Sequence, residues 1–132
     1  MKPTLYTIGH GRQTMEAFLG KLRAAGVRVV CDVRTRPQSR WAPQFSRAAL
    51  QAALEAAGIR YDYHGLTLGG LPPEGFLNHH GTPAYRGAII LLCERATAEA
   101  TAIMCAETDA AKCHRSQIAE DAAAAGFAIV HL

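Results

Sequence analysis

Apolar residues recur along this chain in short blocks, and three of these blocks begin after the same short sequence. Two alanines and a glycine precede an apolar residue in 24–27, 56–59 and 124–127. In each case helix-type spacing leads up to the glycine, a residue that favours the left-handed backbone after a helix end. A strand-type block then follows. Repeated helix-then-strand alternation predicts a parallel sheet with crossover helices.

The pattern predicts alternating strands and helices with defined ranges. The expected strands are 5–9, 27–33, 59–64, 101–106 and 127–131, and the expected helices are 14–25, 46–57, 84–98 and 112–125. Thr14 is a candidate cap for the first helix. Residues 65–83 hold five glycines and three prolines, which predicts a long loop. The expected fold class is α/β, with a Rossmann-like, mainly parallel five-stranded sheet in a single three-layer domain over residues 1–132.

Composition is compatible with this prediction. The chain has 132 residues, of which 49% are hydrophobic, and a domain of that size can bury a core without disulfides or a structural metal. The first residues lack the apolar segment of a signal peptide. The longest strongly apolar run, 88–93, is too short to span a bilayer. We therefore expect a cytoplasmic protein without a membrane partner, with its four cysteines as thiols.

The net charge of +3 permits a phosphate or nucleic-acid ligand without requiring one. Five arginines fall within one twenty-residue stretch: Arg28, Arg34, Arg36, Arg40 and Arg47. A solvated basic face is favoured over a nucleic-acid groove, because no interleaved aromatic residues accompany the arginines.

Chemically active residues follow several of the expected strands. His10 follows the first strand, Asp32 and Arg34 end the second, and Cys105 and Glu107 lie at the end of the fourth. Ligands of open parallel sheets bind outside the carboxyl ends of the strands, so a site is predicted there. Asp32 and Arg34 point to the same side of their strand. They either pair with each other or orient a ligand. His10, between two glycines, is expected to be accessible, and Arg40 to extend the site.

The start of the last expected helix carries Cys113, His114 and Arg115. Free backbone N–H groups and the helix dipole favour an anion at such a position. Arg115 adds a forked donor suited to phosphate or carboxylate. The same field favours a thiolate at Cys113, and Glu107 could act as a general acid or base. Burial of Cys105 as a small core residue is the simpler alternative for that position.

No metal or other cofactor is expected at this site. Cys105, Glu107, Cys113 and His114 are zinc-ligand types, but they show none of the usual zinc-binding spacings. The candidate catalytic residues are therefore Cys105, Glu107, Cys113 and Asp32, and the candidate substrate-binding residues are His10, Arg34, Arg40, His114 and Arg115.

Ordered blocks along nearly the whole chain resemble the family known as domain of unknown function 488. The blocks are 6–10, 32–34, Pro37 with 39–40, Phe45, 68–70, 104–107, 113–115 and 130–131. This resemblance implies a bacterial α/β domain and no established activity. Two departures are Gly11, where members usually have serine, and a shorter segment between 70 and 98. A weaker similarity to rhodanese-like domains rests on 32–34, Cys105 and 115–116.

Three functions are compatible with these residues. The first is an enzyme, hydrolase or transferase, acting on a small anionic or phosphorylated ligand such as a nucleotide, or on nucleic acid. The second is a thiol enzyme of the sulfur-transfer type. The third is a non-catalytic nucleic-acid-binding module. We rank them in that order, and the sequence leaves the oligomeric state open.

Overall fold

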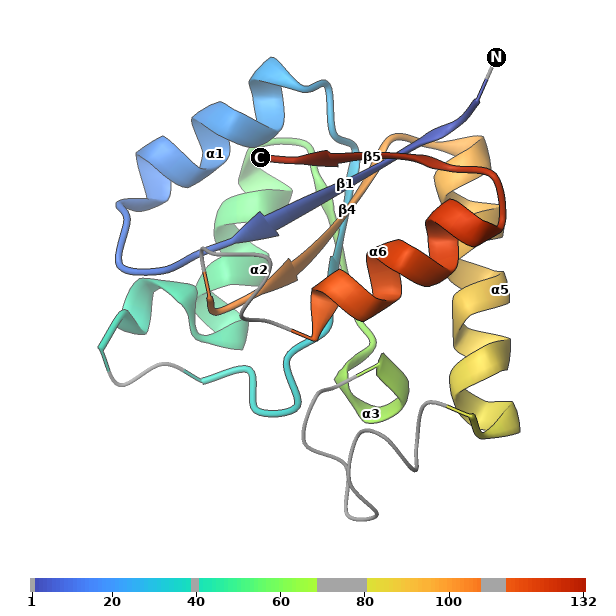
Figure 1. Ribbon diagram of the computed structural model, residues 1–132. Helices are drawn as coiled ribbons and strands as arrows, with labels where there is room; N and C mark the ends of the chain where they lie inside the picture. Colours follow the sequence, from blue (N-terminus) through green and yellow to red (C-terminus); the bar gives the residue numbers. More distant parts are fainter. Residues whose placement is uncertain (1, 39–40, 69–80, 108–113) are drawn as a thin grey trace.

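A single parallel sheet with helices on both faces organises the chain. The computed structural model describes residues 2–38, 41–68, 81–107 and 114–132 (Figure 1). The strands are β1 Thr4–Gly9, β2 Val29–Asp32, β3 Arg60–Tyr63, β4 Thr101–Cys105 and β5 Ala128–His131. The helices are α1 Met15–Ala24, the 3₁₀ turn η1 Pro43–Phe45, α2 Arg47–Ala56, α3 Gly65–Leu68, α5 Pro83–Ala98 and α6 Arg115–Ala124.

The strand order is β3-β2-β4-β1-β5, and every neighbouring pair is parallel. The predicted α/β, Rossmann-like fold with a five-stranded parallel sheet is therefore confirmed. β2 is buried along its whole length, as expected for a strand covered on both faces. Helices α1 and α2 lie on one face of the sheet, and α5 and α6 lie on the other (Figure 1).

Local signals set the helix ends. The Thr14 hydroxyl accepts a hydrogen bond from the Ala17 N–H at 3.1 Å, so the predicted cap of α1 is confirmed. Thr82 caps α5 in the same way, with Pro83 in the first turn. Gly26, Gly58 and Gly126 all have positive φ, which explains the repeated glycine before three strands.

Two corrections concern element boundaries. Residues 65–68 of the expected loop form the short helix α3, and residues 69–80 lie outside the described part of the chain. Helix α6 begins at Arg115 with His114 as its N-cap, and Cys113 also lies outside the described residues. The loop prediction missed α3 because its basis was glycine and proline content.

The sheet separates two apolar clusters. On one face, Phe18 and Leu22 of α1 and Leu50 and Leu54 of α2 pack on β2 and β4. On the other face, apolar residues of α5 and α6 cover the opposite sides of the same strands. Alternation along each strand therefore decides which side chains at the carboxyl ends face α1 and α2, and which face α5 and α6.

Candidate functional site

The carboxyl ends of three strands are joined directly by backbone hydrogen bonds. The His10 N–H donates to the Cys105 carbonyl at 2.9 Å, and the Gly11 N–H donates to the Ala106 carbonyl at 2.9 Å. The Val33 N–H donates to the Met104 carbonyl at 3.0 Å. The residues after β1, β2 and β4 thus form one edge, which we call the carboxyl edge.

Asp32 and Arg34 form a buried ion pair at this edge. Arg34 Nε donates to Asp32 Oδ1 at 2.9 Å and Nη2 donates to Oδ2 at 2.8 Å, in a two-pronged arrangement. Neither side chain is more than 5% exposed. Of the two alternatives open from the sequence, mutual pairing is the one the structure supports.

Further polar groups complete this buried network. The Tyr61 hydroxyl donates to Asp32 Oδ2 at 2.6 Å, and Arg34 Nη1 donates to the Phe45 carbonyl at 2.7 Å. Burial and the hydrogen bond to Asp32 both raise the pKa of Tyr61. The network therefore fixes β2, β3 and η1 relative to one another, and it occupies groups that were expected to meet a ligand.

His10 is buried, so the prediction of an accessible imidazole is wrong. Only 2% of the residue is exposed, because its ring stacks on Phe45 with centroids 4.7 Å apart. Nδ1 donates to the Gly11 carbonyl at 2.7 Å. Nε2 faces Arg34 Nη1 at 3.4 Å and must accept, because a guanidinium can only donate. This arrangement defines a neutral imidazole, and burial lowers the pKa of His10.

The neutral histidines predict a loss of stability in mild acid. Burial also lowers the pKa values of His64 and His114. These groups bind protons more readily in the unfolded chain, where a histidine pKa is about 6.5. Folding therefore becomes less favourable as the pH falls below about 6.5. Urea unfolding at pH 7.5 and 5.5 should show this loss, and His10→Asn should reduce the pH dependence. An unchanged dependence in the variant would exclude His10 as a source.

Arg115 is the largest fully buried side chain, with 1% exposure. Its Nη1 donates to the Cys105 sulfur at 2.9 Å and also to the Glu107 carbonyl. The guanidinium thus holds the end of β4 and the start of α6 together. Gly9 lies so close that an added Cβ would stand 2.6 Å from Arg115 Nη1. The two residues fit because position 9 has no side chain.

Cys105 is 2% exposed and disulfide-bonded. The expectation of four thiols is therefore wrong for Cys105, whereas Cys31 and Cys93 are free. Glu107 lies two positions after Cys105 and is exposed. Its carboxylate is thus the most accessible of the described catalytic candidates.

His114 ties α6 to β2. Its Nε2 donates to the Val33 carbonyl at 2.8 Å, and the side chain is half-buried. Burial lowers the pKa of His114, and backbone hydrogen bonds to Val33 and Leu68 oppose that shift. The described candidates thus gather at one edge but on two faces. Asp32, Arg34 and His10 lie towards η1 and Tyr61, whereas Cys105, His114 and Arg115 lie with α6. Arg40 and Cys113 lie outside the described residues.

Arginine–aromatic pairs near this edge were missed from the sequence. The Arg12 guanidinium lies 5.4 Å from the Trp41 ring centroid, and Trp41 is 75% exposed. Arg47 lies over Tyr63 at 4.6 Å. Trp41 and Phe45 both stand inside the arginine-rich stretch, so the premise that no aromatic residues are interleaved with these arginines is wrong. The pairing of Trp41 with a residue 29 positions earlier depends on the fold.

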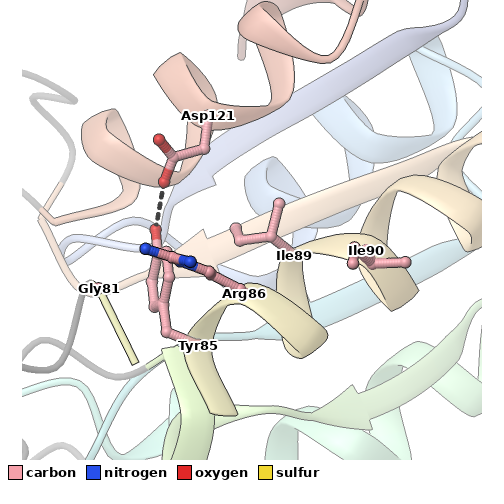
Figure 2. A pocket seen from close by; sticks show the side chains of 6 residues that line it. All are labelled: Gly81, Tyr85, Arg86, Ile89, Ile90 and Asp121. Atoms are coloured by element: carbon pink, nitrogen blue, oxygen red, sulfur yellow. Dashed lines mark hydrogen bonds between the residues drawn. The ribbon is translucent and has the colours of Figure 1, made fainter. Parts of the chain in front are cut away.

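A separate hollow of about 360 Å³ lies between α5 and α6 (Figure 2). Its lining is mostly apolar, with Ile89 and Ile90 on one side. The Tyr85 hydroxyl donates to Asp121 Oδ2 at 2.7 Å, so the main polar groups are engaged with each other. Among the described residues, none of the candidates from the sequence lines this hollow.

Fold and edge together define an α/β protein with an all-parallel, Rossmann-like sheet whose polar residues gather at the carboxyl ends of the strands. The family model of DUF488, a domain of unknown function, matches residues 14–75, and the resemblance noted in the sequence is confirmed over that segment. This segment runs from the cap of α1 past α3, so the resembling blocks around β1, β4 and β5 lie outside it.

No curated protein and no solved structure matches the chain significantly. Among the described residues, no helix is both long and apolar enough to cross a bilayer.

Proposed function

We propose that this protein is an enzyme that binds a phosphate-bearing substrate, a nucleotide or a nucleic acid, at the carboxyl edge of its sheet. The observation that carries the proposal is the exposed Arg12–Trp41 pair beside that edge. An exposed indole offers a face on which a base can stack, and an arginine offers donors for a phosphate.

The pair is positioned by the same backbone contacts that build the edge. Arg12 directly follows Gly11, whose N–H donates to the Ala106 carbonyl at 2.9 Å. Gln44 Nε2 donates to the Gln13 carbonyl at 3.1 Å, which joins the turn after Trp41 to the segment after Arg12. A ligand stacked on Trp41 therefore lies near the chain segment that carries Glu107.

Glu107 supplies the chemical step in this proposal. Its exposed carboxylate follows the end of β4, where a parallel sheet places ligands. It would act as a general base towards water or another nucleophile, or as a general acid towards a leaving group. The carboxyl edge is supported from inside by the buried and half-buried candidates, which are Asp32, Arg34, His10, His114 and Arg115. Their role is to hold the backbone that presents Arg12 and Glu107.

Binding is tested with a labelled single-stranded oligodeoxynucleotide and, in parallel, with AMP. We expect Trp41→Ala to weaken binding by about 5- to 150-fold, since a base stacked on an aromatic ring contributes about 1–3 kcal/mol. Arg12→Ala should weaken binding and reduce its salt dependence. Arg23→Ala is the matched control, because Arg23 is an exposed arginine in the last turn of α1. Equal affinities for all three variants would contradict the proposal.

Catalysis is tested separately from binding. Glu107→Gln should retain ligand affinity and lose turnover, followed as release of inorganic phosphate or cleavage of the oligonucleotide. Binding without turnover in the native protein would instead favour the non-catalytic nucleic-acid module. The sulfur-transfer alternative has less support, because the Cys105 sulfur is buried against Arg115.

A further inference from the structure

A second cluster of reactive side chains lies on the face of β2 and β3 opposite to the Asp32–Arg34 ion pair, and this face is turned towards α5. Cys31 and Asp62 are register partners in the parallel β2–β3 pair, so their side chains stand side by side. His64 follows two positions after Asp62 and therefore points to the same face. The ligand-type atoms of these three residues all lie within 4.8 Å of one another.

The cluster opens into a hollow of about 310 Å³ between the sheet and α5. Cys31 and His64 both line it, together with Leu91, Leu92, Glu94 and Arg95. The two leucines give it an apolar wall, and Glu94 and Arg95 provide charged groups. The hollow leaves room for a water molecule or a small ligand beside the cluster.

The state of each side chain suits a metal ligand. Cys31 is a free cysteine, and His64 is kept neutral because burial lowers its pKa. Within the described chain, the His64 ring nitrogens make no hydrogen bond, although the side chain is half-buried. Asp62 forms an ion pair with Arg95, and a charged partner of this kind fixes the orientation of a carboxylate that binds a metal.

We infer that Cys31, Asp62 and His64 form a zinc-binding site, with a fourth position open to the hollow beside α5. One thiolate, one imidazole and one carboxylate are ligand types that Zn²⁺ accepts, and three protein ligands with an open position are typical of catalytic zinc sites. At Zn–S and Zn–N distances of about 2.3 and 2.0 Å, tetrahedral ligand atoms stand about 3.5 Å apart, so the side chains need to close by at most about 1.5 Å.

Binding would be coupled to loss of a proton. Burial raises the pKa of Cys31 to about 11, so the metal-free protein holds a neutral thiol at pH 7. The ion forms its bond to sulfur as the thiol proton leaves to solvent. Arg95 and Arg60 oppose the rise in that pKa, and Asp32 adds to it. This site is independent of the proposed function, since none of its three ligands belongs to the carboxyl edge residues proposed to bind or act on substrate.

Titration of the purified full chain with Zn²⁺ alone and with Co²⁺ alone tests the inference. We expect one equivalent of Co²⁺ to produce both visible d–d bands and a near-ultraviolet sulfur-to-metal charge-transfer band. Cys31→Ser should abolish the charge-transfer band, and His64→Asn should weaken Zn²⁺ binding at least about tenfold. Cys93→Ser is the matched control, because Cys93 is the other free cysteine of the described residues and lies outside the cluster.

Circular dichroism of each variant separates loss of a ligand from loss of the fold. His64→Asn changes a half-buried side chain and keeps the inference testable if Cys31→Ser fails to fold. Stoichiometric binding that survives in folded His64→Asn, or that is lost in Cys93→Ser, would overturn the assignment. Absence of a charge-transfer band in the native protein would also overturn it.

Discussion

Asp32→Ala is expected to destabilise the protein by about 3–5 kcal/mol, because it leaves the Arg34 guanidinium buried without its carboxylate. Arg34 would keep the Phe45 carbonyl as an acceptor, which cannot neutralise its charge. The Tyr61 hydroxyl would lose its acceptor in the same change. Urea denaturation followed by far-ultraviolet circular dichroism measures the loss.

The chain offers a matched control for this prediction. Arg60 and Glu99 also form an ion pair, at 3.4 Å, but their side chains are 51% and 41% exposed. Glu99→Ala should therefore cost no more than about 1 kcal/mol. The double variant Asp32→Ala, Arg34→Met should recover part of the loss, since it removes the uncompensated charge. A cost for Asp32→Ala no greater than for Glu99→Ala would show that the buried network contributes little.

Gly9→Ala is expected to be the most damaging single-methyl change at the carboxyl edge. The new Cβ would overlap the Glu107 carbonyl and stand 2.6 Å from Arg115 Nη1. Neither group can withdraw easily, because one is backbone and the other is fully buried. Overpacking of this kind costs about 1–3 kcal/mol, and more where backbone must move. Thermal unfolding should show a markedly lower Tm.

Gly20→Ala is the control, and its expected effect on the stability of the protein has the opposite sign. Gly20 lies inside α1, and an added Cβ would meet nothing within 4 Å. The change should stabilise the protein by about 0.5–1 kcal/mol, because alanine favours helix over glycine. Similar Tm values for the two variants would contradict the close approach of Gly9, Glu107 and Arg115.

Most of the fold could be predicted from local sequence patterns. The alternation of helices and strands, the Thr14 cap and the glycines after three helices each depend on neighbours within a few positions. These features were recognisable because capping and helix termination are local chemistry. The parallel strand arrangement followed from them, since each strand is separated from the next by a crossover.

Burial at the site could not be predicted in the same way. His10 stands between two glycines and looks accessible in the sequence, yet Phe45 covers its ring from 35 positions further along. Arg115 looked like an anion-binding residue at a helix start, and its guanidinium instead holds the backbone of Glu107. Sequence position placed these residues at the correct edge. Only tertiary contacts decide whether a side chain at that edge faces solvent or another residue.

The strand order also determines when the sheet can assemble during synthesis. β1 is made first, but its partners are β4, which begins at Thr101, and β5, which begins at Ala128. At about 5–20 residues per second, the ribosome takes about 5–20 s to reach β4 after β1. β2 and β3 can pair well before then. A nascent chain released before residue 101 would thus carry β1 as an unpaired strand, which makes truncated products of this protein natural substrates for chaperones or proteases.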